Sequence, residues 1–192
     1  MLGNGEMDAI DLLLTRESAL KLESPGPSEA DLEVMFQSAL RAPDHGRLRP
    51  WQFVVVPEDK RAAFGDLLAE SMARRRPDAP AEEFARERAK AMRAPVIVAA
   101  AAKLAKGHKI PEVEQLLSAG AAVQNIMLAA NARGYGAMWK TGAPAYDAGV
   151  KQAFGLDADN DIVGFLYLGT QVGGGSPAAR PTVKDLVSVW QG

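Results

Sequence analysis

Arg16 and Ser18 are the first residues in the chain whose types and spacing could bind a phosphate group. A guanidinium fork and a hydroxyl two residues apart can both hydrogen-bond to the oxygens of one phosphate. The alternative is an exposed arginine that forms an ordinary ion pair with its neighbour Glu17. The residues themselves leave both interpretations open.

A second group of polar side chains lies in the segment 41–51, between a predicted helix and a predicted strand. It contains Arg41, His45, Arg49 and Trp51, together with two prolines. Rigid loops that carry hydrogen-bond donors and an aromatic ring commonly form the wall of a ligand site. A surface pair between the histidine and the preceding aspartate is the alternative interpretation.

Lys140 and Thr141 end a stretch that differs at one position from the phosphate-binding loop G-x-x-x-x-G-K-T. Trp139 stands where that loop needs a glycine, and the order of elements is reversed, because a helix precedes and the lysine lies in a predicted strand. The stretch therefore does not predict a nucleotide triphosphatase. Lys140 and Thr141 remain polar groups at the end of a buried strand, where ligands of sheets tend to bind.

The composition excludes several classes of catalyst. The chain has no cysteine and two histidines, which rules out thiolate nucleophiles and Cys-ligated metal sites and makes a zinc enzyme improbable. Neither histidine belongs to a recognisable Ser-His-Asp arrangement. The net charge of −2 argues against a nucleic-acid binder. An enzyme with this sequence would need a bound cofactor to supply the chemistry, and we expect no metal.

The 192 residues are enough for a single domain, 1–192, with a full hydrophobic core. We expect residues 1–6 to be a flexible N-terminus. The glycines at 173–175 predict a joint before an apolar extension, 173–192, that docks on a partner subunit or packs back on its own domain. The chain lacks the roughly 20 consecutive apolar residues of a membrane span and the cationic start of a signal peptide, so we expect a cytoplasmic protein.

Hydrophobic periodicity predicts the elements that must position these side chains. The segment 111–133 is apolar on most faces, which predicts a central helix wrapped by other elements. The alternation of helices and strands predicts an α+β or α/β sandwich with about four strands. Helical patterns cover 7–15, 28–42, 58–75, 81–93, 111–133 and 147–154, and strand patterns cover 51–56, 96–102, 137–141 and 162–170.

Taken in order, these motifs resemble those of the flavin-dependent nitroreductases, in particular their short NAD(P)H nitroreductase branch. The family's opening R-R-S appears as Arg-Glu-Ser at 16–18, and its A-P-[SD]-x-x-x-x-Q-P-W loop appears at 42–51. Its H-K-[IV]-P-x-x-E-Q segment is found at 108–115. The central helix with its following strand is similar to 118–142, and the terminal strand is similar to 162–170.

The resemblance implies an α+β fold, a three-layer sandwich whose mainly antiparallel central sheet is flanked by helices. It implies a homodimer with two FMN molecules at the subunit interface. The residues implied at FMN are Arg16, Glu17 and Ser18 at the phosphate and ribityl end, Trp139, Lys140 and Thr141 along the flavin, and Arg41 and His45 from the partner subunit. Those implied at the nicotinamide nucleotide are Ala129, Ala130, Asn131, Ala132, Arg133 and Gly134.

The activity implied is that of an oxidoreductase in which NAD(P)H and then an electron-poor acceptor occupy the same space beside FMN. Nitroaromatics, quinones and enones are the acceptors expected. A non-catalytic flavin-binding dimer and a flavoenzyme of the same fold with a different reaction remain alternatives.

The sequence departs from the family pattern at three of these positions. Glu17 stands in place of the second arginine, Arg49 in place of a glutamine, and Lys140 in place of an arginine. Glu17 removes a cation and adds a negative charge beside the expected phosphate. Because one charge-assisted hydrogen bond contributes about 1.5–3 kcal/mol, this departure lowers the FMN affinity expected of this chain relative to family members with both arginines.

Overall fold

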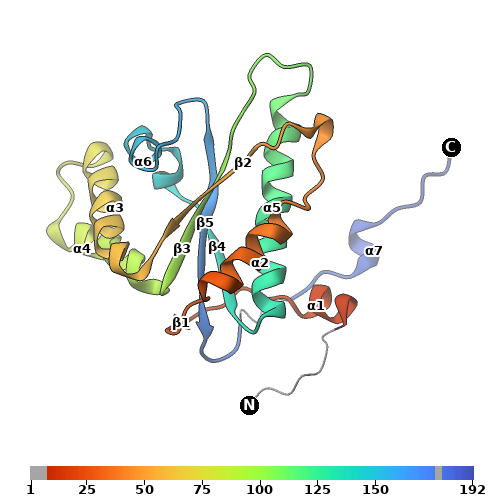
Figure 1. The fold of residues 1–192 in the computed structure, drawn as a ribbon, viewed down its shortest axis with the longest axis horizontal. Coiled ribbons are helices and arrows are strands. Elements are labelled where there is room, and N and C mark those ends of the chain that lie inside the picture. The colour runs from red at the N-terminus through yellow and green to blue at the C-terminus, as the bar shows by residue number, and fades with distance from the viewer. Residues whose placement is uncertain (1–7, 176–178) are drawn as a thin grey trace.

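The computed structural model describes residues 8–175 and 179–192, and its centre is a five-stranded sheet (Figure 1). The strands run in the order β1-β5-β3-β2, and β4 also pairs with β5. Every strand pairing in the described residues is antiparallel, as the resemblance implied. The strands are β1 (Leu22–Glu23), β2 (Trp51–Val56), β3 (Val96–Ala102), β4 (Gly136–Lys140) and β5 (Asp161–Gln171).

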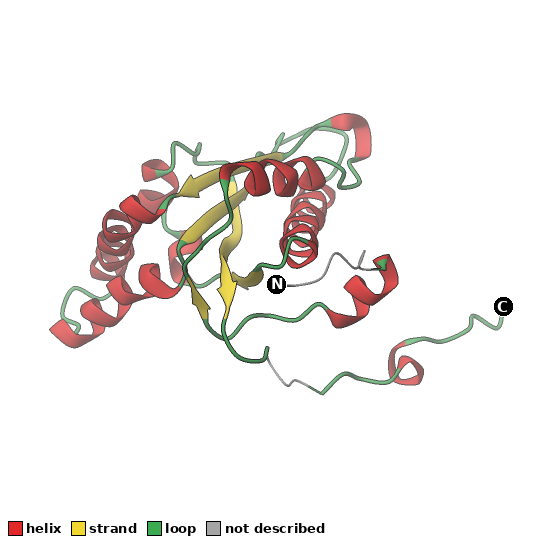
Figure 2. Ribbon diagram, turned by 60° about the horizontal axis from the view of Figure 1, so that its bottom comes forward, coloured by secondary structure: helices red, strands yellow, loops and turns green. Residues whose placement is uncertain are grey.

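Helices cover both faces of this sheet, which gives the expected three layers (Figures 1 and 2). Helices α2 and α5 lie on one face, and α3, α4 and α6 lie on the other. The α-helices are α1 (Ala9–Thr15), α2 (Glu29–Ala39), α3 (Arg61–Arg75), α4 (Ala81–Ala89), α5 (Glu112–Ala132), α6 (Ala148–Ala153) and α7 (Val183–Leu186). Short 3-10 turns are η1 (His45–Arg47), η2 (Glu58–Lys60), η3 (Lys90–Arg93) and η4 (Ala143–Tyr146).

The period-two alternation of β5 divides the interior into two hydrophobic cores. Phe165 and Tyr167 belong to the core under α3, while Leu166 and Leu168 belong to the core under α2 and α5. Successive side chains of a strand point to opposite faces, so one strand supplies both cores. Strand β3 lies beside β5 and is buried along its whole length, which agrees with its uninterrupted apolar sequence.

Two expectations need correction. The sequence predicted about four strands, but β1 adds a fifth; its two residues are too few to give a periodic signal, and pairing with Gln171 and Thr170 of β5 creates it. Helix α5 is not wrapped on all sides within one chain, because the side chains of Val113 and Leu117 are 59% and 68% exposed. The expected flexible N-terminus, 1–6, lies outside the described residues.

The C-terminal segment from residue 179 extends away from the layers (Figure 2). Apart from the four-residue helix α7, it has no regular structure, and its apolar side chains face solvent. Trp190 is 89% exposed and Leu186 is 75% exposed. Its apolar side chains therefore do not pack on their own domain, although Arg180 donates to the carbonyl oxygen of Arg16 at 2.9 Å.

A charged network around Asp31 joins α2 to the end of α5. Asp31 accepts hydrogen bonds from the Ser28 hydroxyl at 2.7 Å, from Arg133 Nε at 2.8 Å and from the Tyr135 hydroxyl at 2.8 Å. These donors stabilise the carboxylate, and they lower the pKa of Asp31 to about 2 despite its burial. Ser28 also caps α2 by accepting from the backbone N–H of Asp31.

We predict that Asp31→Asn lowers the free energy of unfolding at pH 7 by about 1.5–3 kcal/mol, the range for hydrogen bonds to a charged group. Because the folded-state pKa lies below that of an unfolded aspartate, the contribution is complete above about pH 4 and is lost as the pH falls toward 2. Urea denaturation at several pH values measures both effects.

Glu33→Gln on the exposed face of the same helix is the control, and we expect it to change stability little. A difference between wild type and Asp31→Asn that stays constant from pH 7 to pH 3 would contradict this account of the network.

Candidate functional site

Two cavities adjoin on the sheet face that carries α3 and α4. They share Arg93, Lys140 and Tyr167 in their walls. The β1 cavity, of about 430 Å³, is further lined by residues 19–23, Met92 and Met138. The β4 cavity, of about 370 Å³, is further lined by residues 141–144, Leu68, Arg75, Glu87, Lys90 and Phe165.

Strand β4 forms the edge of the sheet between these cavities and the segment 16–19. The backbone N–H of Ala19 donates to the carbonyl oxygen of Ala137 at 3.0 Å, on the side of β4 away from β5. Main-chain groups alternate in direction along a strand, so the N–H and C=O of Trp139 point to the same outer edge. No other strand pairs with that edge in the described residues.

The side chains of Trp139 and Lys140 leave this strand on opposite faces. Lys140 lines both cavities, whereas Trp139 packs toward α5 and donates from Nε1 to the carbonyl oxygen of Val163 at 3.2 Å. Gly164 makes room for the indole, because a Cβ there would lie 2.1 Å from Trp139 Nε1. Of the three predicted flavin residues on this strand, only Lys140 and Thr141 therefore line the β4 cavity.

The predicted phosphate-binding residues 16–18 run from the end of α1 to the outer edge of β4. No ion pair joins Arg16 to Glu17 in the part of the chain that the structure describes, which disfavours the alternative interpretation of Arg16. Glu17 instead accepts a hydrogen bond from Gln171 Nε2 at 2.7 Å. The chain after β5 also packs on Glu17, because a Cβ at Gly175 would lie 1.9 Å from Glu17 Cδ.

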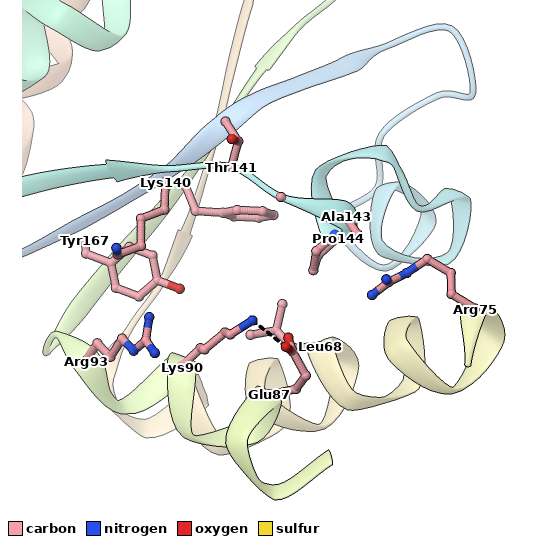
Figure 3. A pocket seen from close by; sticks show the side chains of 12 residues that line it. Leu68, Arg75, Glu87, Lys90, Arg93, Lys140, Thr141, Ala143, Pro144 and Tyr167 are labelled. Carbon is pink, nitrogen blue, oxygen red and sulfur yellow. Dashed lines mark hydrogen bonds and ion pairs between the residues drawn. The ribbon is translucent and has the colours of Figure 1, made fainter. Parts of the chain in front are cut away.

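Positive charge gathers around the β4 cavity (Figure 3). Arg75, Arg93 and Lys140 have no carboxylate within ion-pair distance among the described residues, whereas Lys90 pairs with Glu87. Sequence reasoning found only Lys140. The other cations lie on α3 and η3, and only the packing of those elements opposite β4 brings them together.

Tyr167 is a further residue of the site that the sequence did not reveal. It is 5% exposed and packs in the core under α3, so its place in an apolar strand gave no sign of a polar role. Burial raises the pKa of Tyr167 to about 12, and the phenol is therefore a neutral hydrogen-bond donor at pH 7.

Arg41 and His45 lie on the other face of the sheet, so one chain does not bring them to Lys140. His45 Nδ1 lies 2.6 Å from Glu114 Oε2 of α5. The expected alternative, a pair with Asp44, is not formed, because the Asp44 carboxylate accepts the backbone N–H groups of Leu48 and Arg49. The loop therefore has a fixed shape.

A buried hydrogen-bond chain anchors the same loop to α5. Trp51 Nε1 donates to the Ser118 hydroxyl at 3.0 Å, and that hydroxyl donates to the carbonyl oxygen of Pro43 at 2.6 Å. Arg47 and Arg49 adopt left-handed backbone conformations, with φ of 56° and 51°. Such conformations are strained for a side chain with a Cβ and persist where surrounding contacts impose them.

The predicted nicotinamide stretch, 129–134, forms the end of α5. Gly134, with φ of 81°, closes the helix, and the N–H of Tyr135 returns to the carbonyl oxygen of Ala130 at 2.8 Å. Asn131 Nδ2 donates to the Tyr135 carbonyl, and Arg133 binds Asp31. The polar side chains of this stretch are thus engaged within the chain.

A metal-binding cluster and a membrane-spanning helix are both absent from the described residues. No group of histidine, aspartate or glutamate side chains there could hold a metal ion. No helix there is long and apolar enough to cross a membrane.

Comparisons with known proteins identify the class of protein to which this fold and the site at the edge of β4 belong. The family model described as "Nitroreductase family" matches residues 13–170. The Escherichia coli K12 protein named "Putative NAD(P)H nitroreductase YdjA" is 40% identical over 164 residues, which cover 85% of this chain and 88% of that protein. The chain therefore belongs to the nitroreductase family, a family of oxidoreductases.

Solved structures agree on the fold. A nitroreductase-like family protein from Bacillus cereus superposes with a TM-score of 0.82 at 21% identity and covers 100% of both chains. A structure from Desulfovibrio desulfuricans, solved in complex with FMN, gives a TM-score of 0.73 at 25% identity, covering 94% of this chain and 95% of that chain.

We predict that Ser118→Ala loosens the loop that carries Arg41 and His45. The substitution leaves Trp51 Nε1 without its acceptor and the Pro43 carbonyl without its donor, at a cost of about 1–3 kcal/mol. Hydrogen exchange should accelerate in residues 44–49, and the denaturation midpoint should fall.

Ser38→Ala is the matched control, because its hydroxyl bonds only within α2 at an exposed position. Equal exchange rates in 44–49 for wild type and Ser118→Ala would show that this hydrogen-bond chain does not hold the loop.

Proposed function

We propose that the protein is an FMN-dependent oxidoreductase that uses NAD(P)H to reduce electron-poor acceptors such as nitroaromatics, quinones or enones. The observation that carries the proposal is the surroundings of strand β4: the segment 16–19 reaches its open main-chain edge, and the two adjoining cavities beside it are lined by cations without carboxylate partners among the described residues. Membership of the nitroreductase family and the FMN complex of the Desulfovibrio desulfuricans relative support the same reading.

The hydrogen-bond donors around strand β4 fit the chemistry of FMN. At one end, Arg16 and Ser18 offer a guanidinium and a hydroxyl for the phosphate. In the middle, the outward N–H and C=O of Trp139 match a ring that carries both donors and acceptors. Lys140 and Arg93 add positive charge at the far end. The residues present therefore suit the cofactor at both its anionic and its heteroaromatic parts.

FMN, when bound, supplies the two-electron redox chemistry, so the chain itself needs no nucleophile or acid–base pair. Arg16 and Ser18 would hold the phosphate, and the open main-chain edge of β4 would offer hydrogen-bond partners to the ring. Lys140 and Arg93 place fixed positive charge beside the site, which stabilises negative charge without reorganisation of solvent. The buried wall formed by Leu68 and Phe165 keeps water from one side.

The functional unit that we propose is a homodimer of a single-domain chain. The apolar side chains that one chain leaves exposed include groups in three parts of the chain: Leu13 and Leu14 on α1, Val113 and Leu117 on α5, and Val183, Leu186, Val187, Val189 and Trp190 in the C-terminal segment. A second copy that covers them would also bring its own Arg41 and His45 toward FMN. The C-terminal extension, 173–192, then docks on the partner, and the nicotinamide role of 129–134 remains a prediction.

The first test uses purified protein incubated with FMN and gel-filtered. We expect retained flavin absorbance, a mass of two chains, and oxidation of NADH or NADPH that depends on a nitroaromatic or quinone. Retained flavin that NAD(P)H does not reduce would favour the non-catalytic flavin-binding dimer, and failure to bind flavin at any concentration would overturn the proposal.

The charge at positions 16 and 17 should set the affinity for FMN. We predict that Arg16→Ala weakens FMN binding by about tenfold or more, because it removes a charge-assisted hydrogen bond, and that Glu17→Gln strengthens binding. Fluorescence titration of FMN measures both constants, and gel filtration checks that the dimer persists.

Arg86→Ala is the control for loss of positive charge, because Arg86 forms only an exposed pair with Glu82 on α4. An FMN affinity that is unchanged in Arg16→Ala, or lowered in Glu17→Gln, would place the phosphate elsewhere.

A further inference from the structure

The β4 cavity contains a polar group that the proposed FMN site does not use. The hydroxyl of Tyr167 points into the cavity, and the side chains of Arg93 and Lys90 reach toward it from the opposite wall (Figure 3). The tyrosine is 5% exposed, and its hydroxyl has no hydrogen-bond partner among the described residues. The hydroxyl oxygen itself is not among the buried unpaired atoms of the described residues, so it is accessible from the cavity and available to a ligand.

The charges around this hydroxyl favour an anion. Glu87 is the only carboxylate that lines the cavity, and Lys90 neutralises it. Arg93 and Lys140 remain without an acidic partner in the described part of the chain, and Arg75 enters from the other end of the cavity. A neutral phenol and a guanidinium both donate hydrogen bonds, so a group that accepts at two oxygens would satisfy both.

The rest of the wall fits an aromatic ring. Leu68 and Pro144 supply apolar surface between the polar end at Tyr167 and the end at Arg75 (Figure 3), and Phe165 also lines the cavity. A ligand site of this kind, apolar with a few convergent polar groups, binds small organic molecules in a fixed orientation. Lys140 lines both this cavity and the β1 cavity, so the acceptor site would adjoin the site proposed for FMN.

We propose that the β4 cavity selects acceptors that carry a carboxylate, with Tyr167 and Arg93 as the residues that bind it. The inference rests on the proposed function, because it names the class of acceptor for that site: an aromatic acid with an electron-poor group, such as a nitrobenzoate. Tyr167 and Arg93 are specificity residues in this scheme. Lys140 contributes positive charge to both the acceptor and the cofactor.

A site built to hydrogen-bond a substrate group discriminates strongly against a substrate that lacks it, because its own donors are then left unpaired. The same donors could serve a different anionic oxygen, that of the reduced cofactor. The carboxylate of an acceptor and the anionic oxygen of the reduced cofactor would accept the same hydrogen bonds. A substitution at Tyr167 distinguishes them. It changes the affinity for the acceptor in the first case, and the affinity and potential of the cofactor in the second.

The test compares 4-nitrobenzoate with the neutral 4-nitrobenzamide as acceptors for the FMN-loaded protein. We expect wild type to have a lower KM for the acid, and Tyr167→Phe to raise that KM by about tenfold or more, as expected for loss of a hydrogen bond to a charged group. The KM for the amide should change by less than about twofold, because the hydroxyl donates to a charged group only in the acid. Arg93→Gln should shift the two acceptors in the same pattern.

Tyr146→Phe is the matched control, because Tyr146 lies on the neighbouring turn η4 and is 77% exposed. The FMN dissociation constant and the flavin reduction potential are measured for every variant. Equal losses for both acceptors in Tyr167→Phe, or an FMN affinity or potential altered by that substitution, would assign the hydroxyl to the cofactor or to stability and overturn the inference. A wild type without preference for the acid would overturn it as well.

Direct binding separates this inference from the proposed function. Calorimetric titration of the protein with 4-nitrobenzoate needs no turnover, and we expect weaker binding to Tyr167→Phe than to wild type or Tyr146→Phe. If NAD(P)H oxidation is absent but this difference is found, the proposed reaction fails and the carboxylate site stands. If oxidation is present but the difference is absent, the carboxylate site fails alone.

Discussion

The pairing of β5 with three other strands is the constraint on which the rest of the molecule depends. β5 pairs with β3, β4 and β1, and its residues 165–168 pair with β3 and β4 at the same time. This arrangement requires close approach at two glycines: a Cβ at Gly164 would collide with Trp139, and one at Gly169 would lie 2.6 Å from Pro95 Cδ. Because β5 fixes the register of β4, it also decides that Lys140 faces the cavities and that Trp139 faces α5.

The fold was largely predictable because its signals are local. The uninterrupted apolar run of β3, the apolar run of β5 and the Ser28 cap of α2 can each be read from adjacent residues. The missing strand β1 had no such signal, since two residues gain their conformation only from β5. The exposure of α5 could not be foreseen either, because an apolar helix face is the same in sequence whether its own chain or a second copy covers it.

The candidate site was predictable only in part, for a related reason. Arg16, Ser18 and Lys140 stand out because a polar side chain follows a predicted element at a place where ligands bind. Arg93 and Tyr167 carry no such mark: one ends a charged, helical stretch and the other continues an apolar strand. Their role depends on their being close to Lys140 in the folded chain, and the packing of η3 and α3 opposite β4 creates that proximity. Family resemblance supplied Arg41 and His45, which lie across the sheet in one chain.

Strand β3 limits the substitutions that the sandwich can accept, because its small side chains lie between the two helical layers. Four consecutive alanines, 99–102, separate the two helical layers, so the spacing of those layers is set by single methyl groups. A larger residue there would push α3 or α5 outward, and cores tolerate such overpacking poorly. The walls of the β4 cavity are held by the same spacing. Substitutions at the rim of the cavity, on the turn 141–144 and on η3, can therefore alter its shape without changing the spacing of the layers.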